Sequence, residues 1–193
     1  MRYVNITLLT IISVIFLVNC AKKKPELESS LRGKCFEGAP KWVIEPQIAG
    51  DLSAVGSAKV GKAGIQFAKT EATALARDEI ARMMGVKVKN MVRNFVQVTG
   101  VGDSETVDRV SKQVSTQVAS QLLVGSRAEA QWLSPCNELF VLVKLDPKEA
   151  GKAVREAVIT SYKNQQALWQ MFQAKKAWEE LDRQIEKEFG SWK

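Results

Sequence analysis

Three cysteines are the residues of this chain with the clearest chemistry, and Cys20 is the most informative of them. It is the last residue of the tetrapeptide Leu17-Val18-Asn19-Cys20. This tetrapeptide overlaps the end of an uncharged, largely apolar run at 6–18. This pattern is typical of a bacterial lipoprotein signal, in which the cysteine becomes the first mature residue and carries acyl chains such as palmitate. The run is too short for a membrane-spanning helix, which needs about 20 apolar residues. We therefore predict a signal peptide at 1–19 and lipidation of Cys20.

The residues next to Cys20 bear on this prediction. Asn19 is larger than the Gly, Ala or Ser that usually precedes a lipidated cysteine, so an uncleaved signal anchor or an ordinary secretory signal stays an alternative. Ala21 stands where an acidic residue would act as a sorting signal, which favours lipid anchoring in the outer membrane. The charged and polar residues that follow predict a flexible tether at 20–34.

Cys35 and Cys136 remain as an even pair once Cys20 is lipidated. An exported location permits a disulfide between them. The bond would close a loop of about 100 residues and contribute about 4–5 kcal/mol in the chain-entropy model. We predict this disulfide, and two unrelated buried thiols are the alternative.

The chain contains no histidine, which removes the commonest general base and the commonest metal ligand. Asp103 and Glu105 are a candidate carboxylate pair for hydrolysis, but their spacing suits helix capping. The segment from Gly56 to Lys62 nearly matches a phosphate-binding loop, yet Ala63 stands where that loop needs Ser or Thr. We predict no enzymatic activity, no cofactor, no metal and no nucleotide.

The spacing of apolar residues predicts the first elements of the fold. Small residues alternate at 53–58 and predict a strand, and a three-four spacing at 65–83 predicts a helix that Gly85 ends. Valines on even positions at 86–98 alternate with polar residues, which predicts a long strand with one buried face.

The break from Gly100 to Gly102 separates these elements from the rest. After it we predict a helix capped by Asp103 or Ser104, with the apolar stripe Val107, Val110, Val114, Val118 and Leu122. A hairpin of strands at 128–132 and 139–145 should follow, and then a helix opened by Pro147. This order predicts an α+β domain at 35–149, in which helices cover a small and mainly antiparallel sheet.

A C-terminal helical extension is predicted at 150–193, because no strong breaker interrupts the sequence from Ala150 to Phe189. Its apolar stripe includes Trp178 and Leu181 and needs a partner. This long helix either packs on its own domain or pairs with another chain.

The net charge of +7 comes partly from a basic region between Lys59 and Arg93. Lys87, Lys89 and Arg93 lie on the polar side of the predicted strand, and they form a candidate interaction face together with Trp178 and Leu181. An exported protein meets little nucleic acid, so acidic glycans, anionic lipid or an acidic protein are the expected partners. A merely solvated basic face is the alternative.

Four segments resemble a known family, namely Pro40-Lys41-Trp42-Val43, Ala54-Val55-Gly56-Ser57-Ala58, the end of an alanine-rich helix at 76–81 and the strand at 140–145. Over about residues 35–147 the chain resembles the Lpp-twenty type of bacterial outer-membrane lipoproteins, which is similar to the N-terminal domain of a flagellar T-ring assembly protein. The resemblance implies a small dodecin-like α+β domain on a lipid tether, and it brings no catalytic residues with it.

These observations lead to one functional hypothesis and one alternative. We expect a non-enzymatic outer-membrane lipoprotein that acts as a binding or assembly module of the cell envelope, with a flagellar association implied by the resemblance alone. Its partners would be the membrane, through the lipid on Cys20, and envelope proteins or a second copy, through the C-terminal helix. The alternative is a periplasmic regulator of a cell-wall enzyme or a binder of cell-wall glycan.

Overall fold

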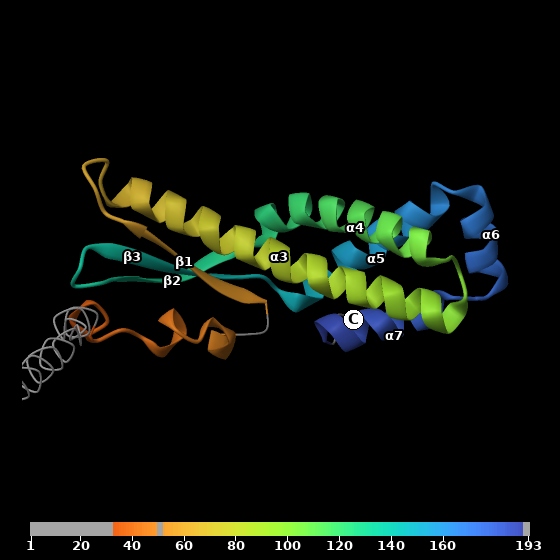
Figure 1. The fold of residues 1–193 in the computed structure, drawn as a ribbon, viewed down its shortest axis with the longest axis horizontal. Helices are drawn as coiled ribbons and strands as arrows, with labels where there is room; N and C mark the ends of the chain where they lie inside the picture. The colour runs from red at the N-terminus through yellow and green to blue at the C-terminus, as the bar shows by residue number, and fades with distance from the viewer. Residues whose placement is uncertain (1–32, 50–51, 191–193) are drawn as a thin grey trace, which may run out of the picture. The chain divides into compact units, whose positions relative to one another are not determined.

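A long helix lies across a three-stranded sheet at one end and packs among further helices at the other (Figure 1). The computed structural model describes residues 33–49 and 52–190. Residues 38–193 form one compact unit and residues 1–37 belong to a separate one. All the elements described below lie in the larger unit.

The sheet contains β1 (Ser53–Lys59), β2 (Arg127–Leu133) and β3 (Glu138–Lys144). All pairs are antiparallel and the spatial order is β1-β3-β2, so β3 is the central strand. Two short 3₁₀ helices, η1 (Lys41–Val43) and η2 (Pro46–Ala49), precede β1. The three strands confirm the predictions at 53–58, 128–132 and 139–145.

Gly56 brings β1 into direct contact with the helix that covers it. A Cβ atom at this position would lie 1.9 Å from the carbonyl oxygen of Ala72 and 2.7 Å from the backbone nitrogen of Ala76. Only glycine allows the two backbones to approach so closely. The segment that nearly matches a phosphate-binding loop begins at Gly56, and its residues up to Lys59 form a regular strand. Gly56 therefore serves close packing of the strand on the helix, and the near match to the loop pattern is coincidental.

The strand predicted at 86–98 is wrong, because α3 (Ile65–Thr99) continues through it as one helix of 35 residues. Met84, Val88, Met91, Val92, Phe95 and Val96 are all buried and follow a three-four spacing. Val86 and Val98, which completed the even-numbered alternation, are 63% and 62% exposed. Gly85 lies inside the helix, and the left-handed Gly100 (φ +64°) ends it, as the Gly100 to Gly102 break predicted.

Two of the predicted helices begin at the predicted residues, and in each an aspartate caps the first turn. In α4 (Ser104–Gly125) the carboxylate of Asp103 accepts a hydrogen bond from the Thr106 backbone N–H at 2.8 Å. In α5 (Pro147–Lys163) Pro147 occupies the first turn and Asp146 accepts from the Lys148 N–H at 2.8 Å. The predicted stripe of α4 is buried from Val107 to Val118, and the side chain of Leu122 lies outside the described residues.

The long C-terminal helix is also a wrong prediction, because the chain breaks after α5 into α6 (Gln166–Ala174) and α7 (Trp178–Phe189). Neither break contains glycine or proline. Asn164 ends α5, and Lys176 adopts a left-handed conformation (φ +48°) between α6 and α7. The turns reverse the chain, so that α7 returns along α3 and α5.

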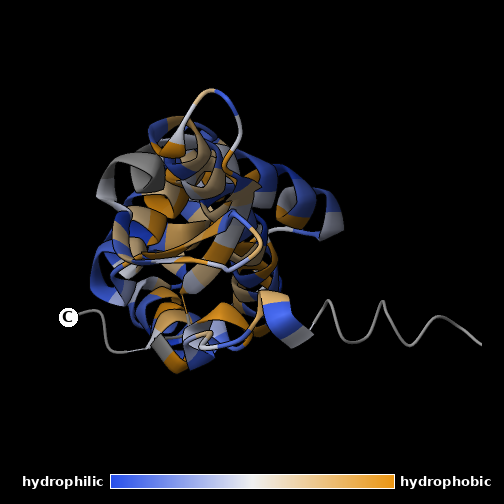
Figure 2. Cartoon of the chain, turned by 90° about the vertical axis from the view of Figure 1, so that its left-hand side faces the viewer, coloured by the Kyte–Doolittle hydropathy of each residue, from blue (hydrophilic) through white to orange (hydrophobic). Residues whose placement is uncertain are grey.

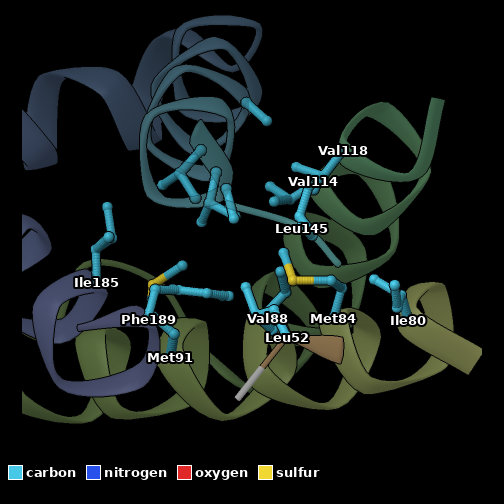
Figure 3. Packing of buried hydrophobic residues seen from close by; sticks show 14 of the residues in the cluster. Leu52, Ile80, Met84, Val88, Met91, Val114, Val118, Leu145, Ile185 and Phe189 are labelled. Carbon is cyan, nitrogen blue, oxygen red and sulfur yellow. The ribbon is translucent and has the colours of Figure 1, made fainter. Parts of the chain in front are cut away.

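The hydrophobic core extends from the sheet into the helices. In Figure 3, Met84, Val88 and Met91 of α3 face Val114 and Val118 of α4 on one side and Ile185 and Phe189 of α7 on the other. Figure 2 shows apolar segments of the helices and the sheet facing the interior. The α+β fold with a small antiparallel sheet packed against helices is therefore confirmed, and the helices of the C-terminal extension belong to the same core.

Candidate functional site

The predicted lipidation site, Cys20, lies outside the described residues, as do the signal peptide at 1–19 and most of the tether at 20–34. The predicted disulfide lies within them. The structure contains a bond between Cys35 and Cys136, so both thiols are consumed and the alternative of two separate buried thiols is wrong. Within the described part of the chain, no helix has the length and hydropathy of a membrane-spanning segment.

Lys87, Lys89 and Arg93 do not share one face, because they lie on a helix and not on a strand. The Lys87 ammonium donates to the Glu188 carbonyl of α7 at 2.7 Å and lies 5.9 Å from the Phe189 ring centroid. Lys89 forms an ion pair with Asp108 of α4 at 3.1 Å. Arg93 is exposed one turn after Lys89. The lysine at 87 therefore joins α3 to α7, on a different side of α3 from the other two cations.

Leu181 is fully buried, and Trp178 is half-buried against its own chain. The Trp178 ring lies 4.8 Å from the ring of Phe172 and 5.8 Å from the guanidinium carbon of Arg155. Arg155 is also bound to Asp182 of α7 at 2.7 Å. The part of the apolar stripe that contains Trp178 and Leu181 is thus covered by the domain, which was one of the two predicted arrangements, whereas Met171 is 41% exposed.

An aromatic cluster holds α6 and α7 in place. Phe172 of α6 lies at its centre with no exposed surface. Its ring centroid lies 5.7 Å from Phe95 of α3, 5.5 Å from Tyr162 of α5, 5.4 Å from Trp169 and 4.8 Å from Trp178. The Phe172 side chain therefore connects four helices. The cluster could not be predicted from the sequence, because its members are spread over 84 positions and come together only where the chain reverses its direction.

Tyr162 supplies the one phenol of this cluster. Its hydroxyl donates to the Val101 carbonyl at 3.2 Å, and burial raises the pKa of Tyr162 well above its usual value. The ring therefore stays neutral at physiological pH, and its role is to pack and to satisfy a buried carbonyl.

A hollow lies along the flank of α3 that faces the start of β2, in the half of the molecule that contains the sheet (the sheet half), and we call it the α3–β2 groove. It has a volume of about 520 Å³. Its lining consists of polar and charged residues of α3 with one alanine of β2, namely Gln66, Lys69, Thr70, Thr73, Ala74, Arg77, Asp78 and Ala128. After Gln66, the members on the helix are pairs of neighbouring residues that repeat every four positions, at 69/70, 73/74 and 77/78, which places them on one side.

Arg77 is fixed at the floor of the α3–β2 groove. Its Nε donates to the Ser126 hydroxyl at 2.9 Å, and a terminal nitrogen lies 3.4 Å from the Ser126 carbonyl oxygen. Lys69 is exposed at the rim. Two cations face one acid, Asp78, so the groove has a local positive charge that suits an acidic ligand.

The side chains that line this groove can form ion pairs and hydrogen bonds with a ligand. Its nitrogen and oxygen groups are ammonium, guanidinium, hydroxyl and amide, and Asp78 is its only carboxylate. Elsewhere, the backbone N–H and the hydroxyl of Thr106 hold the pKa of Asp103 below its usual value, which fits a capping carboxylate and not a proton donor. Over the described residues, His, Cys, Asp and Glu side chains do not cluster in threes as metal ligands would.

A family model described as LPP20 lipoprotein matches residues 40–146, which is more than half of the chain. The match covers the sheet with α3 and α4, and it includes every residue that lines the α3–β2 groove. No curated protein is significantly similar to the chain.

Proposed function

Because the chain belongs to the LPP20 lipoprotein family, we propose that it is a lipid-anchored, non-enzymatic binding module of the bacterial outer membrane. The family is not a known enzyme family, and its lipoprotein character points to the cell envelope. The lipobox-like sequence that ends at Cys20 supports the anchor, and Ala21 after it supports the outer membrane.

The observation that carries the binding role is the α3–β2 groove. It is an open, positively charged hollow within the segment that the family model matches. At the C-terminal helices Leu181 and Ile185 are fully buried in the core, and the hollow beside α7 is smaller, with a volume of about 360 Å³. We therefore assign partner binding to the sheet half of the molecule, and not to α6 and α7 as the sequence suggested.

Loss of the lipid anchor should release the protein from membranes. In a Cys20→Ala variant we expect the chain to move from the membrane fraction to the soluble periplasmic fraction, because acyl chains supply the membrane affinity. Immunoblotting of fractionated cells measures this distribution. A Cys20→Ala protein that remained in the membrane fraction would show that something other than the lipid holds it there.

Charge reversal in the groove should weaken partner binding. Lys69→Glu replaces an exposed cation at the rim, and we expect about fivefold less partner protein in a crosslinked pull-down with the full chain. Lys112→Glu is the matched control, since Lys112 is an exposed lysine on α4 outside the groove. Equal capture by both variants would remove the groove from the binding surface.

The same groove supports a second candidate, a binder of cell-wall glycan. Thr70 and Thr73 stand beside Lys69 and Arg77, and hydroxyl groups beside cations suit an acidic sugar. Sedimentation with isolated sacculi distinguishes the two candidates. Binding to sacculi that falls with salt and with Lys69→Glu favours the glycan, whereas protein partners without sacculus binding favour the assembly module.

A further inference from the structure

Strand β2 forms an exposed edge of the sheet. It pairs with β3 alone among the described strands, and its residues are exposed or half-buried on both faces. The central strand β3 is buried on both faces from Leu139 to Val143. The helix α3 explains the difference, because it packs on β1 and β3 and leaves β2 beside it.

The backbone of β2 has hydrogen-bonding groups that point away from the sheet. The Ser134 N–H donates to the Glu138 carbonyl at 2.8 Å, so the backbone groups of these two residues point toward each other across the β2–β3 hairpin. Because the ladder of an antiparallel pair alternates, Trp132 and Ala130 also face β3, opposite Phe140 and Leu142. Gln131 and Leu133 therefore direct their N–H and C=O groups outward.

The other edge of the sheet is different. The start of β1 packs against η2, and the Ser53 hydroxyl donates to the Pro46 carbonyl at 2.6 Å. Proteins commonly cover or charge the edges of their sheets, because an open edge pairs with other chains. An edge such as β2, with exposed backbone groups and the 45% exposed side chain of Leu133, is suited to accept an added strand.

The charges near this edge indicate what such a strand would carry. Lys69 and Arg77 line the groove between α3 and β2, and Arg127 is exposed at the start of β2. Of the nearby acids, Asp78 lines the same groove, and Glu129 of β2 is paired with Lys144 of β3 at 3.0 Å. A second copy of this chain would bring the same cations to the same edge, and the net charge of +7 opposes that pairing. An acidic segment of another protein has the complementary charge.

We propose that β2 binds an extended, acidic segment of a partner protein as a fourth strand of the sheet. The segment pairs with the outward groups of Gln131 and Leu133, and its acidic side chains lie toward Lys69 and Arg77. The register shift between Ala128 and Ala130 limits the pairing to the second half of β2. This inference rests on the proposed function as a binding module, to which it adds the mode of binding and the chemistry of the partner.

Photo-crosslinking of the full chain in its own cells tests the proposal. A photoreactive residue replaces Leu133 in one protein and Lys112 of α4 in the control, and the crosslinked residues of the partner are identified by mass spectrometry. Each protein is made with Gln131→Pro or with Gln131→Thr. Proline removes an outward N–H that the β2–β3 ladder does not use, whereas threonine keeps it and favours strands.

We expect position 133 to crosslink to one acidic segment of another protein, with about tenfold less product in Gln131→Pro than in Gln131→Thr. A synthetic peptide of that segment should bind the purified full chain. Its version with alternate backbone nitrogens methylated should bind about tenfold more weakly, since it keeps the charges and loses the donors. This peptide comparison decides the question even if Gln131→Pro does not fold.

Several results would overturn the proposal. Crosslinks from position 133 to a second copy, to the chain's own N-terminal residues or to a glycan would show a different occupant. Equal binding of the methylated peptide would show an electrostatic contact without strand addition, and no product above that at position 112 would show that the edge is unused. If one of these results were found and Lys69→Glu still lowered partner capture, the proposed function as a binding module would be retained and the proposal of strand addition at β2 would be rejected.

Discussion

Phe172→Ala is expected to lower the free energy of unfolding by about 3–5 kcal/mol, the range for a large aromatic side chain removed from a packed core. Phe172 has no exposed surface and contacts rings from α3, α5 and α7 as well as Trp169 of its own helix. Its loss leaves a cavity where four helices meet. Urea unfolding followed by tryptophan fluorescence measures the change, since Trp169 and Trp178 adjoin the site.

Met171→Ala is the matched control for this prediction. Met171 precedes Phe172 on the same helix and is 41% exposed, so its truncation should change the free energy of unfolding by about 0.5 kcal/mol or less. Similar effects of the two substitutions would mean that α6 does not pack on the domain in solution. That outcome would restore the second predicted arrangement, in which the C-terminal helices pair with another chain.

Reduction of the disulfide is the second large effect. The bond between Cys35 and Cys136 closes a loop of about 100 residues, and opening it should cost about 4–5 kcal/mol in the chain-entropy model. The urea midpoint should therefore fall when a reductant is added. The double variant Cys35→Ser with Cys136→Ser should already unfold at the lower midpoint and show no response to the reductant.

A midpoint that did not move on reduction would contradict this prediction. A non-reducing peptide digest analysed by mass spectrometry provides the necessary control, because it shows whether the peptides of Cys35 and Cys136 are joined before reduction. The two measurements together separate a bond that is absent from a bond that adds little stability.

Much of the sheet half could be predicted from the sequence, because its signals are local. Small residues at Ala54, Gly56 and Ala58 marked β1, and the turn residues around Pro135 marked the hairpin. Asp103 marked the start of α4 through a side chain that caps the first turn, and Pro147 marked the start of α5. In each case one short stretch of chain carries both the pattern and its cause.

The wrong predictions have a common cause, which is that distant contacts outweigh the local pattern. Valines at 86–98 alternate, yet Met91 and Phe95 complete a helical stripe once α4, α5 and α7 surround it. The breaks around α6 carry no glycine or proline, and the aromatic rings gathered around Phe172 favour the chain reversal there. Tertiary packing commonly overrides intrinsic propensity in this way.

The sequence predicted a basic interaction surface, but it pointed to other residues than those that line the α3–β2 groove. The basic region between Lys59 and Arg93 includes Lys69 and Arg77, but the strand predicted at 86–98 directed attention to Lys87, Lys89 and Arg93. The polar residues at 66–77 lie in the helix predicted at 65–83, but the hollow that they form with Ala128 depends on how β2 lies beside that helix. The exposure of β2 could not be predicted either, since it depends on which strands α3 covers.

The assignment of partner binding to the sheet half is tested most directly by two photoreactive positions in the full chain in cells. One replaces Thr73 in the α3–β2 groove, and the other replaces Lys187 on the exposed side of α7. The account predicts adducts with other envelope molecules at position 73 and only background at position 187. Adducts at position 187 without any at position 73 would contradict it and return the C-terminal helices to the role of the binding surface.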